Sequence, residues 1–359
     1  MPMQQDSAVN THAVKRSSLR RHLVVAAVAL AVVPMSVAVA PTASAQEDAV
    51  LTTLSFEGLD RPQGVAVNAA GDVFVADTGN NRVLKLRPSG LQVQLPFTGL
   101  DSPQAVAVNT AGDVFVADTG NGRVLKLEAG TSTQTVLPAM YDDYYDDTHR
   151  YTNRRPIGLA VDVGGDLLVL DDGIGRVVRI PVGADVGIGL PLKVVTPGGI
   201  AVDSAGTVYV SYGGHSGDDA HVVKLPAGAS AGIDLPFRFF GVIYRGIGVD
   251  SAGDVLTAEY WSGTVWRLSA GKDAPTREPF TDLAEPAGLA IDNLGDVYVA
   301  DTANNRIVKL TYPCVGWLCA LRGLQLYFPP ELRPCLFLPL LCNPCGPFGL
   351  CLPPELRGR

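Results

Sequence analysis

Charged and aromatic residues are scarce in this sequence, and cysteine is confined to one end of it. Only 18% of the 359 residues are charged and 7% are aromatic, and all six cysteines lie between Cys314 and Cys351. Disulfides therefore cannot cross-link the segments before residue 314. Runs with helical periodicity are also scarce, whereas short apolar runs between Gly, Pro, Asn and Asp are frequent, which favours an all-β fold. The 47% of hydrophobic residues exclude a disordered chain.

Basic residues are fewer than acidic ones, and this bears on the class of partner. The chain has 28 Lys and Arg against 36 Asp and Glu, a net charge of −8. Residues 1–45 contain four of the basic residues and one of the acids, so the rest of the chain carries −11. A surface of this sign does not attract a phosphate backbone, so we do not expect nucleic acid to be a partner.

Residues 1–45 have the three parts of a secretory signal peptide. A basic region contains Lys15, Arg16, Arg20 and Arg21. The apolar run 23–40 follows, and Ala43-Ser44-Ala45 is a small-residue cleavage site. The run approaches the length of a membrane span, so an uncleaved anchor is the alternative. Because Pro34 and Pro41 interrupt and end the run, we predict cleavage before Gln46 and a secreted or cell-envelope-associated protein.

One sixteen-residue stretch occurs three times. It reads GDVFVADTGNNRVLKL at 71–86, GDVFVADTGNGRVLKL at 112–127 and GDVYVADTANNRIVKL at 295–310. Its first glycine recurs at six positions, spaced by 41, 53, 41, 47 and 42 residues: Gly71, Gly112, Gly165, Gly206, Gly253 and Gly295. A fixed period in this range is typical of a propeller or a solenoid.

The units consist of four short apolar runs separated by turns, except that the sixth ends after its third run. In the first unit, Pro62-Gln63-Gly64 precedes the runs, which lie at 65–67, 73–76, 82–86 and 92–96. Four antiparallel strands in about 43 residues describe a propeller blade. We therefore predict an all-β, six-bladed β-propeller over 46–310. The sixth unit ends after its third strand, so we expect residues 51–56 to supply the fourth and close the ring, which hides both sheet edges.

The pattern P-x-G-[VIL]-A-[VI]-[DN]-x-x-G-D, followed by the D-x-x-N-N-R turn, resembles the NHL repeat. The match is strongest in the units that begin at Pro62, Pro103 and Pro286. The sequence of residues 95–108 also resembles that of the extracellular sensor propeller of mycobacterial transmembrane serine/threonine kinases. A Gly-rich phosphate loop and the H-R-D and D-F-G motifs are absent from the sequence. The resemblance therefore implies a sensor-type propeller without a kinase domain.

An aspartate and an arginine five residues apart recur in the turn after the second strand. The pairs are Asp77 with Arg82, Asp118 with Arg123, Asp171 with Arg176, and Asp301 with Arg306. A ring of ligand-binding carboxylates is one interpretation. We favour a structural hairpin in which Asp pairs with Arg across the turn, because a group repeated in the blades is usually part of the blade itself.

Three departures from the repeat fall in adjacent units. They are an insertion at 140–151, the segment 213–221 in place of a short turn, and the substituted turn 259–262. Because loops alternate between the two faces of a meander, all three are predicted on the face that carries the Pro-x-Gly segments, here called face A.

Aromatic anchors among carboxylates on a rigid scaffold favour binding of a protein or a cell-envelope carbohydrate, and a merely solvated insertion is the alternative. The ligand-binding candidates are Tyr141, Asp142, Asp143, Tyr144, Tyr145, Asp146, Asp147, His149, Tyr151, His215, Asp218, Asp219, His221, Tyr260 and Trp261.

Patterns for metal binding and catalysis are weak. The aspartates of 142–147 lack EF-hand spacing, so we predict neither a metal nor a cofactor. Some propellers of this general kind are lyases or lactonases, which need His or carboxylates at the central channel. The runs expected nearest the axis are almost purely apolar, so we predict no catalytic residue. A propeller enzyme and a stand-alone sensor for a separate serine/threonine kinase are the alternatives.

Residues 311–359 differ in composition from the repeats. They contain nine prolines and the six cysteines, Cys314, Cys319, Cys335, Cys342, Cys345 and Cys351. An even number of cysteines in an exported chain favours disulfides, whose connectivity the sequence leaves open. A zinc site is less favoured, because the tail has one C-x-x-C and no histidine. The apolar residues also suit association with the cell envelope, and a disordered extension is the alternative.

Overall fold

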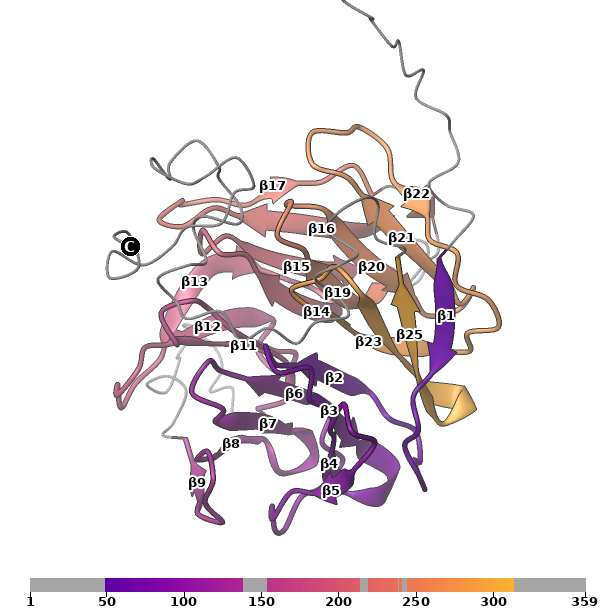
Figure 1. The fold of residues 1–359 in the computed structure, drawn as a ribbon. Helices are drawn as coiled ribbons and strands as arrows, with labels where there is room; N and C mark the ends of the chain where they lie inside the picture. Colours follow the sequence, from indigo (N-terminus) through magenta and orange to yellow (C-terminus); the bar gives the residue numbers. More distant parts are fainter. Residues whose placement is uncertain (1–48, 138–153, 214–218, 238, 241–243, 313–359) are drawn as a thin grey trace, which may run out of the picture. The chain divides into compact units, whose positions relative to one another are not determined.

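The computed structural model describes residues 49–137, 154–213, 219–237, 239–240 and 244–312 (Figure 1). Its regular elements in these ranges are strands, apart from three 3₁₀ turns of three residues each. The strands form six antiparallel sheets in chain order, which confirms the predicted all-β, six-bladed β-propeller. Within the described ranges, no helix has the length and hydropathy that crossing a bilayer requires.

Blades 1 to 3 each contain four strands. Blade 1 has β2 (Gly64–Val67), β3 (Val73–Asp77), β4 (Arg82–Leu86) and β5 (Gln92–Gln94). Blade 2 has β6 (Ala105–Val108), β7 (Val114–Asp118), β8 (Arg123–Leu127) and β9 (Gln134–Val136). Blade 3 has β10 (Pro156–Val161), β11 (Leu167–Asp171), β12 (Arg176–Ile180) and β13 (Ile188–Lys193).

Blades 4 to 6 follow the same order. Blade 4 has β14 (Pro197–Val202), β15 (Val208–Gly213), β16 (Asp219–Leu225) and β17 (Ile233–Asp234), and β18 (Phe239–Phe240) also pairs with β16. Blade 5 has β19 (Tyr244–Val249), β20 (Val255–Glu259), β21 (Thr264–Leu268) and β22 (Thr276–Arg277). Blade 6 has β23 (Pro286–Ile291), β24 (Val297–Asp301), β25 (Arg306–Thr311) and β1 (Val50–Thr53).

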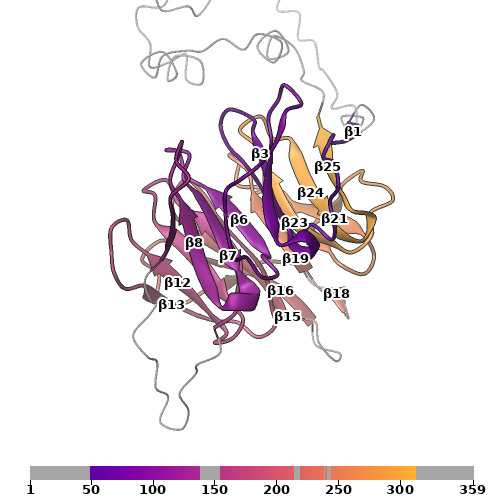
Figure 2. The same cartoon turned by 90° about the horizontal axis from the view of Figure 1, so that it is seen from below.

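The strand β1 closes the ring by pairing with β25, as predicted (Figures 1 and 2). Val50 lies opposite Thr311, and Thr53 lies opposite Val308. The strand ends earlier than the predicted 51–56, because the chain turns after Thr53: the N–H of Phe56 donates to the carbonyl of Leu54 at 2.9 Å. Leu54 and Phe56 then pack into a cluster formed between blades 6 and 1.

The second strand of most blades is buried along its whole length. All five residues of β3 are buried, and the same holds for its counterparts β7, β11, β20 and β24. Each hydrophobic cluster joins residues of neighbouring blades, such as Phe74 of blade 1 with Val116 and Leu125 of blade 2. Because each sheet is covered on both faces by its neighbours, these strands read as continuous apolar runs.

Glycines let the innermost strands approach one another closely. These strands contact each other in the order β2, β6, β10, β14, β19, β23 and back to β2. A Cβ on Gly246 would lie 2.7 Å from the carbonyl oxygen of Ala287, and one on Gly288 would lie 2.2 Å from that of Gln63. Residues just before the apolar run of each inner strand are thereby held against the next blade and around the central channel.

Candidate functional site

The repeated Asp–Arg turn binds its own blade to the connection that precedes it. Asp77 is fully buried, and its Oδ2 accepts from Arg82 Nε at 2.6 Å and from Asn80 Nδ2 at 2.9 Å. Its Oδ1 accepts from the backbone N–H of Asp60 at 2.7 Å, and Arg82 Nη2 donates to the carbonyl of Gly58. Both carboxylate oxygens are therefore occupied by the protein, as a structural turn requires.

The same arrangement occurs in other blades. Arg Nε and Asp Oδ2 lie 2.6 Å apart in the pair Asp118 and Arg123 and in the pair Asp301 and Arg306. In blade 3, Asp171 Oδ1 accepts from the backbone N–H of Arg155 at 3.0 Å, and Arg176 lies directly opposite Asp171 in the strand register.

Asp118→Asn is expected to lower the free energy of unfolding by about 2 kcal/mol. The amide keeps the volume of the side chain but loses the charge that Arg123 pairs with, and the loss is moderated because Arg123 is 32% exposed and can be hydrated. Chemical denaturation measures the change. Asp172→Asn is the matched control, because its partner Arg155 is 53% exposed and the pair should be worth less than about 0.5 kcal/mol. Equal costs for the two variants would contradict the structural role.

Threonine hydroxyls of these turns fix the Pro-x-Gly segment of the next blade. Thr78 Oγ1 donates to the carbonyl of Pro103 at 2.7 Å, and Thr119 Oγ1 donates to that of Pro156 at 2.6 Å. Thr302 Oγ1 donates to the carbonyl of Pro62 at 2.7 Å and so joins blade 6 to blade 1. The turns and the Pro-x-Gly segments therefore share one face, as predicted for face A. The middle residue of each segment has a fixed place around the channel.

Blades 4 and 5 replace the Asp–Arg pair with other residues. In blade 4, Tyr212 lies opposite His221, and their rings stack with centroids 5.3 Å apart. In blade 5, Glu259 takes the position of the aspartate and accepts from Trp266 Nε1 at 3.2 Å. Burial, and secondly the charge of Glu259, raises the pKa of Tyr244. The sector singled out from the sequence therefore differs chemically from the rest of face A.

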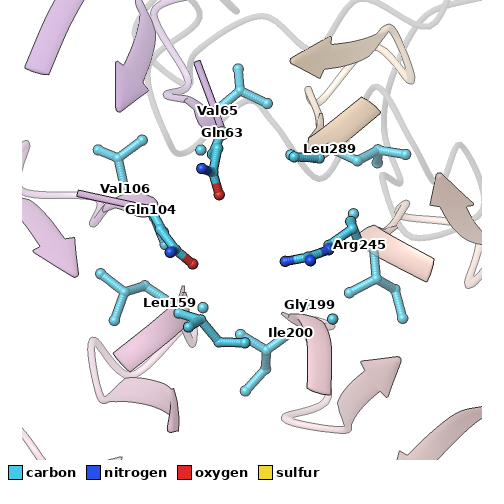
Figure 3. Close-up of a pocket in the computed structure, with 18 residues that line it drawn as sticks. Gln63, Val65, Gln104, Val106, Leu159, Gly199, Ile200, Arg245 and Leu289 are labelled. Atoms are coloured by element: carbon cyan, nitrogen blue, oxygen red, sulfur yellow. The ribbon is translucent and has the colours of Figure 1, made fainter. Parts of the chain in front are cut away.

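A cavity of about 70 Å³ lies in the central channel, where four Pro-x-Gly segments meet their counterparts, Pro103-Gln104-Ala105 of blade 2 and Tyr244-Arg245-Gly246 of blade 5 (Figure 3). The middle residues of these six segments are Gln63, Gln104, Ile157, Gly198, Arg245 and Ala287, and all six line the cavity. The side chains of Gln63, Gln104 and Arg245 point from three blades toward the channel axis (Figure 3). We call these three residues the channel-mouth cluster. Among the described residues that line the cavity, Arg245 is the only charged one.

The prediction of apolar strands around the channel is correct for the runs that follow each Pro-x-Gly, but it missed the channel-mouth cluster. Val65, Val106 and Leu159 line the cavity beside it. The missed signal was the variable middle position of Pro-x-Gly, which precedes each apolar run and lies at the same place in every blade.

Arg245 rests on Tyr260, one of the residues predicted from the sequence. Its guanidinium carbon lies 5.2 Å from the centre of the Tyr260 ring. The Tyr260 hydroxyl donates to Glu285 Oε2 at 2.7 Å, and burial together with this hydrogen bond raises the pKa of Tyr260. Trp261 packs edge-on against Tyr260 with ring centroids 4.8 Å apart and is 67% exposed. A half-buried tyrosine and an exposed tryptophan therefore lie next to the channel-mouth cluster.

The remaining predicted site residues are outside the described residues. These are Tyr141, Asp142, Asp143, Tyr144, Tyr145, Asp146, Asp147, His149, Tyr151, His215 and Asp218. Asp219 is the first residue of β16. The predicted signal peptide 1–45 and the six cysteines also lie outside the residues that the structure describes. Within the described ranges, no three His, Cys, Asp or Glu side chains gather in a way that would hold a metal ion.

Comparison with known proteins supports the repeat and the fold. The NHL repeat family matches residues 59–86, 100–127 and 283–310, and no curated protein matches the chain. Among solved structures, the chain is similar to a gluconolactonase from Xanthomonas campestris, with 18% identity and a TM-score of 0.58 over 75% of this chain and 91% of that one.

Two further structures have comparable similarity. A virginiamycin B lyase from Staphylococcus aureus has 15% identity and a TM-score of 0.52 over 75% of this chain and 89% of that one. The calcium-binding protein regucalcin from Agrobacterium tumefaciens has 16% identity and a TM-score of 0.54 over 72% and 92%. At such identities the likeness shows the fold alone. The chain contains NHL repeats and folds as a six-bladed β-propeller.

Proposed function

We propose that this protein is an exported binding module that captures a protein or a cell-envelope carbohydrate through face A. The observation that carries the proposal is the exposed Trp261, which packs against the half-buried Tyr260 beside the channel-mouth cluster. Large aromatic side chains on a rigid scaffold provide contact area at a low entropic cost, and a nearby charged group provides orientation. The proposed export rests on the signal-peptide pattern of residues 1–45.

The lining of the cavity favours binding over catalysis. Hydrolysis or elimination at the channel would require a general base or a metal-bound water. The described residues that line the cavity include neither a carboxylate nor a histidine. Glu259 and Glu285 already accept hydrogen bonds from Trp266 and Tyr260, respectively. Turnover of a streptogramin or a sugar lactone by the purified protein would replace the proposal with an enzyme of the lyase or lactonase type.

The proposal includes a sensor role as its more specific form. The repeats resemble the sensor propeller of mycobacterial serine/threonine kinases, and the sequence lacks the kinase motifs. A ligand captured on face A would then be reported to a separate protein. Binding of that protein to the free propeller and to the ligand-bound propeller with equal affinity would exclude this form.

Trp261→Ala is expected to weaken capture about thirtyfold, which corresponds to about 2 kcal/mol for an aromatic anchor. Protein recovered from culture medium, with Gln46 expected at its N-terminus, is immobilised and exposed to fractionated envelope polysaccharide and protein. The melting temperature should change little, because Trp261 is 67% exposed.

Leu294→Ala is the matched control for Trp261→Ala. Leu294 is also a large apolar residue on the surface, 60% exposed, but it lies in the turn between β23 and β24 on the face opposite to face A. The control should retain every component that the unaltered protein retains. If Leu294→Ala loses capture and Trp261→Ala retains it, face A is not the binding face.

A further inference from the structure

We propose that the channel-mouth cluster binds the carboxylate of a sugar acid, with Arg245 as the charged partner and the amides of Gln63 and Gln104 as neutral donors. This inference rests on the proposed function, because it names the ligand chemistry of face A. Three observations support it: the three side chains meet at one cavity, Arg245 has no acidic partner among the described residues, and the cavity has room for a small polar group.

The cluster is built from residues that are far apart in the sequence and meet only in the closed ring. Gln63 and Gln104 occupy the middle Pro-x-Gly position of blades 1 and 2, and Arg245 occupies the corresponding position of blade 5 on the other side of the channel (Figure 3). The corresponding residues Gly198 and Ala287, which flank Arg245 in the ring, are small. The guanidinium therefore faces the two amides across an open space.

Among the residues that the structure describes, Arg245 has no acidic partner, whereas three other arginines of face A do. Arg82, Arg123 and Arg306 each pair with a buried aspartate at 2.6 Å. Arg245 forms no ion pair with any residue that the structure describes, and its buried Nε has no hydrogen-bond partner there. The ring of Tyr260 holds the guanidinium by a cation–π contact, and the terminal guanidinium nitrogens point into the channel, where a ligand can reach them (Figure 3).

A carboxylate fits this site better than a neutral group. A guanidinium donates two parallel N–H bonds to the two oxygens of a carboxylate, a geometry that a hydroxyl cannot match. A cavity of about 70 Å³ has room for several water molecules or for the small polar end of a ligand. The exposed face of Trp261 lies beside Tyr260 and is suited to packing against the apolar face of a sugar ring.

The test is calorimetric titration with D-glucuronate, D-glucose and acetate. We expect the unaltered protein to bind glucuronate, to bind acetate more weakly, and to bind glucose at least about tenfold more weakly than glucuronate, since glucose lacks the charge. Arg245→Gln should lower the glucuronate affinity at least about tenfold, and Arg245→Lys should give an intermediate loss because the charge remains. Gln63→Ala combined with Gln104→Ala should weaken binding severalfold without altering the Arg245–Tyr260 contact.

Arg87→Gln is the matched control. It makes the same change of charge at an exposed arginine on the opposite face. The affinity of this variant for glucuronate should equal that of the unaltered protein. Equal binding of glucose and glucuronate, or equal losses in Arg245→Gln and Arg87→Gln, would overturn the inference. If glucuronate binding fails while Trp261→Ala still weakens capture, the carboxylate site is wrong and the binding face is right. If Arg245→Gln loses glucuronate but no envelope component is captured, the site is right and the proposed function fails.

Discussion

A chain that begins at Gly58 is expected to self-associate, and to lose about 4 kcal/mol of stability relative to one that begins at Gln46. The truncation removes β1 and leaves the hydrogen-bonding edge of β25 unpaired. It also removes Leu51, Leu54 and Phe56 from the clusters on both sides of blade 6, each half-buried and worth about 1 kcal/mol. Chemical denaturation measures the stability, and size-exclusion chromatography with light scattering measures the association.

A synthetic peptide of residues 46–57 provides the control for this truncation. Added to the shortened chain, it should restore the monomer, whereas the same peptide with Leu51→Asp and Leu54→Asp should not, because these side chains pack into the blade. A shortened chain that stays monomeric and melts like the longer one would show that β1 does not close the ring.

Gly198→Ala is expected to cost at least about 4 kcal/mol, among the largest effects of a single methyl group. A Cβ on Gly198 would lie 1.7 Å from the carbonyl oxygen of Tyr244 and 2.9 Å from Ser211 Oγ. Since the first contact is with backbone, the inner strands of blades 4 and 5 must separate. Arg245 follows Tyr244 directly, so the same variant should lose glucuronate binding.

Gly90→Ala is the control that measures the cost of backbone strain without a steric clash. Gly90 has a φ of +83° in an outer turn, and a Cβ there would meet nothing within 4 Å. Its cost should be the conformational strain alone, about 1 kcal/mol. Denaturation curves of the two variants measured side by side make the comparison. Similar costs would mean that the inner strands relax readily and that glycine is not required at their contacts.

The fold could be predicted because its information is local and repeated. The glycine at position 71 and its five counterparts set the number of blades, and each apolar run sets a strand. The closing strand could be predicted because the sixth unit lacks a fourth strand after Leu310. The residue at which β1 ends could not be predicted, because the turn at Leu54–Phe56 depends on packing against two blades that the sequence does not show as neighbours.

The candidate site was predictable only in part. Tyr260 and Trp261 were found because they depart from a repeat whose other units are regular. Gln63, Gln104 and Arg245 were missed because each is a single polar residue in a separate unit, and only closure of the ring brings them to one cavity. The contact of Arg245 with Tyr260 likewise joins two segments of one blade across its inner hairpin, and no spacing in the sequence indicates it.

The register of β1 with β25 determines how the ring responds to mechanical force. Val50 is opposite Thr311, so the two ends of the described chain leave the sheet at the same end of this strand pair. The ladder bonds are perpendicular to the strands, and tension between the two ends loads them one after another, beginning at Val50. The hydrogen bonds between β1 and β25 should therefore break one at a time at low force. The other blades should unfold only after β1 has separated from β25.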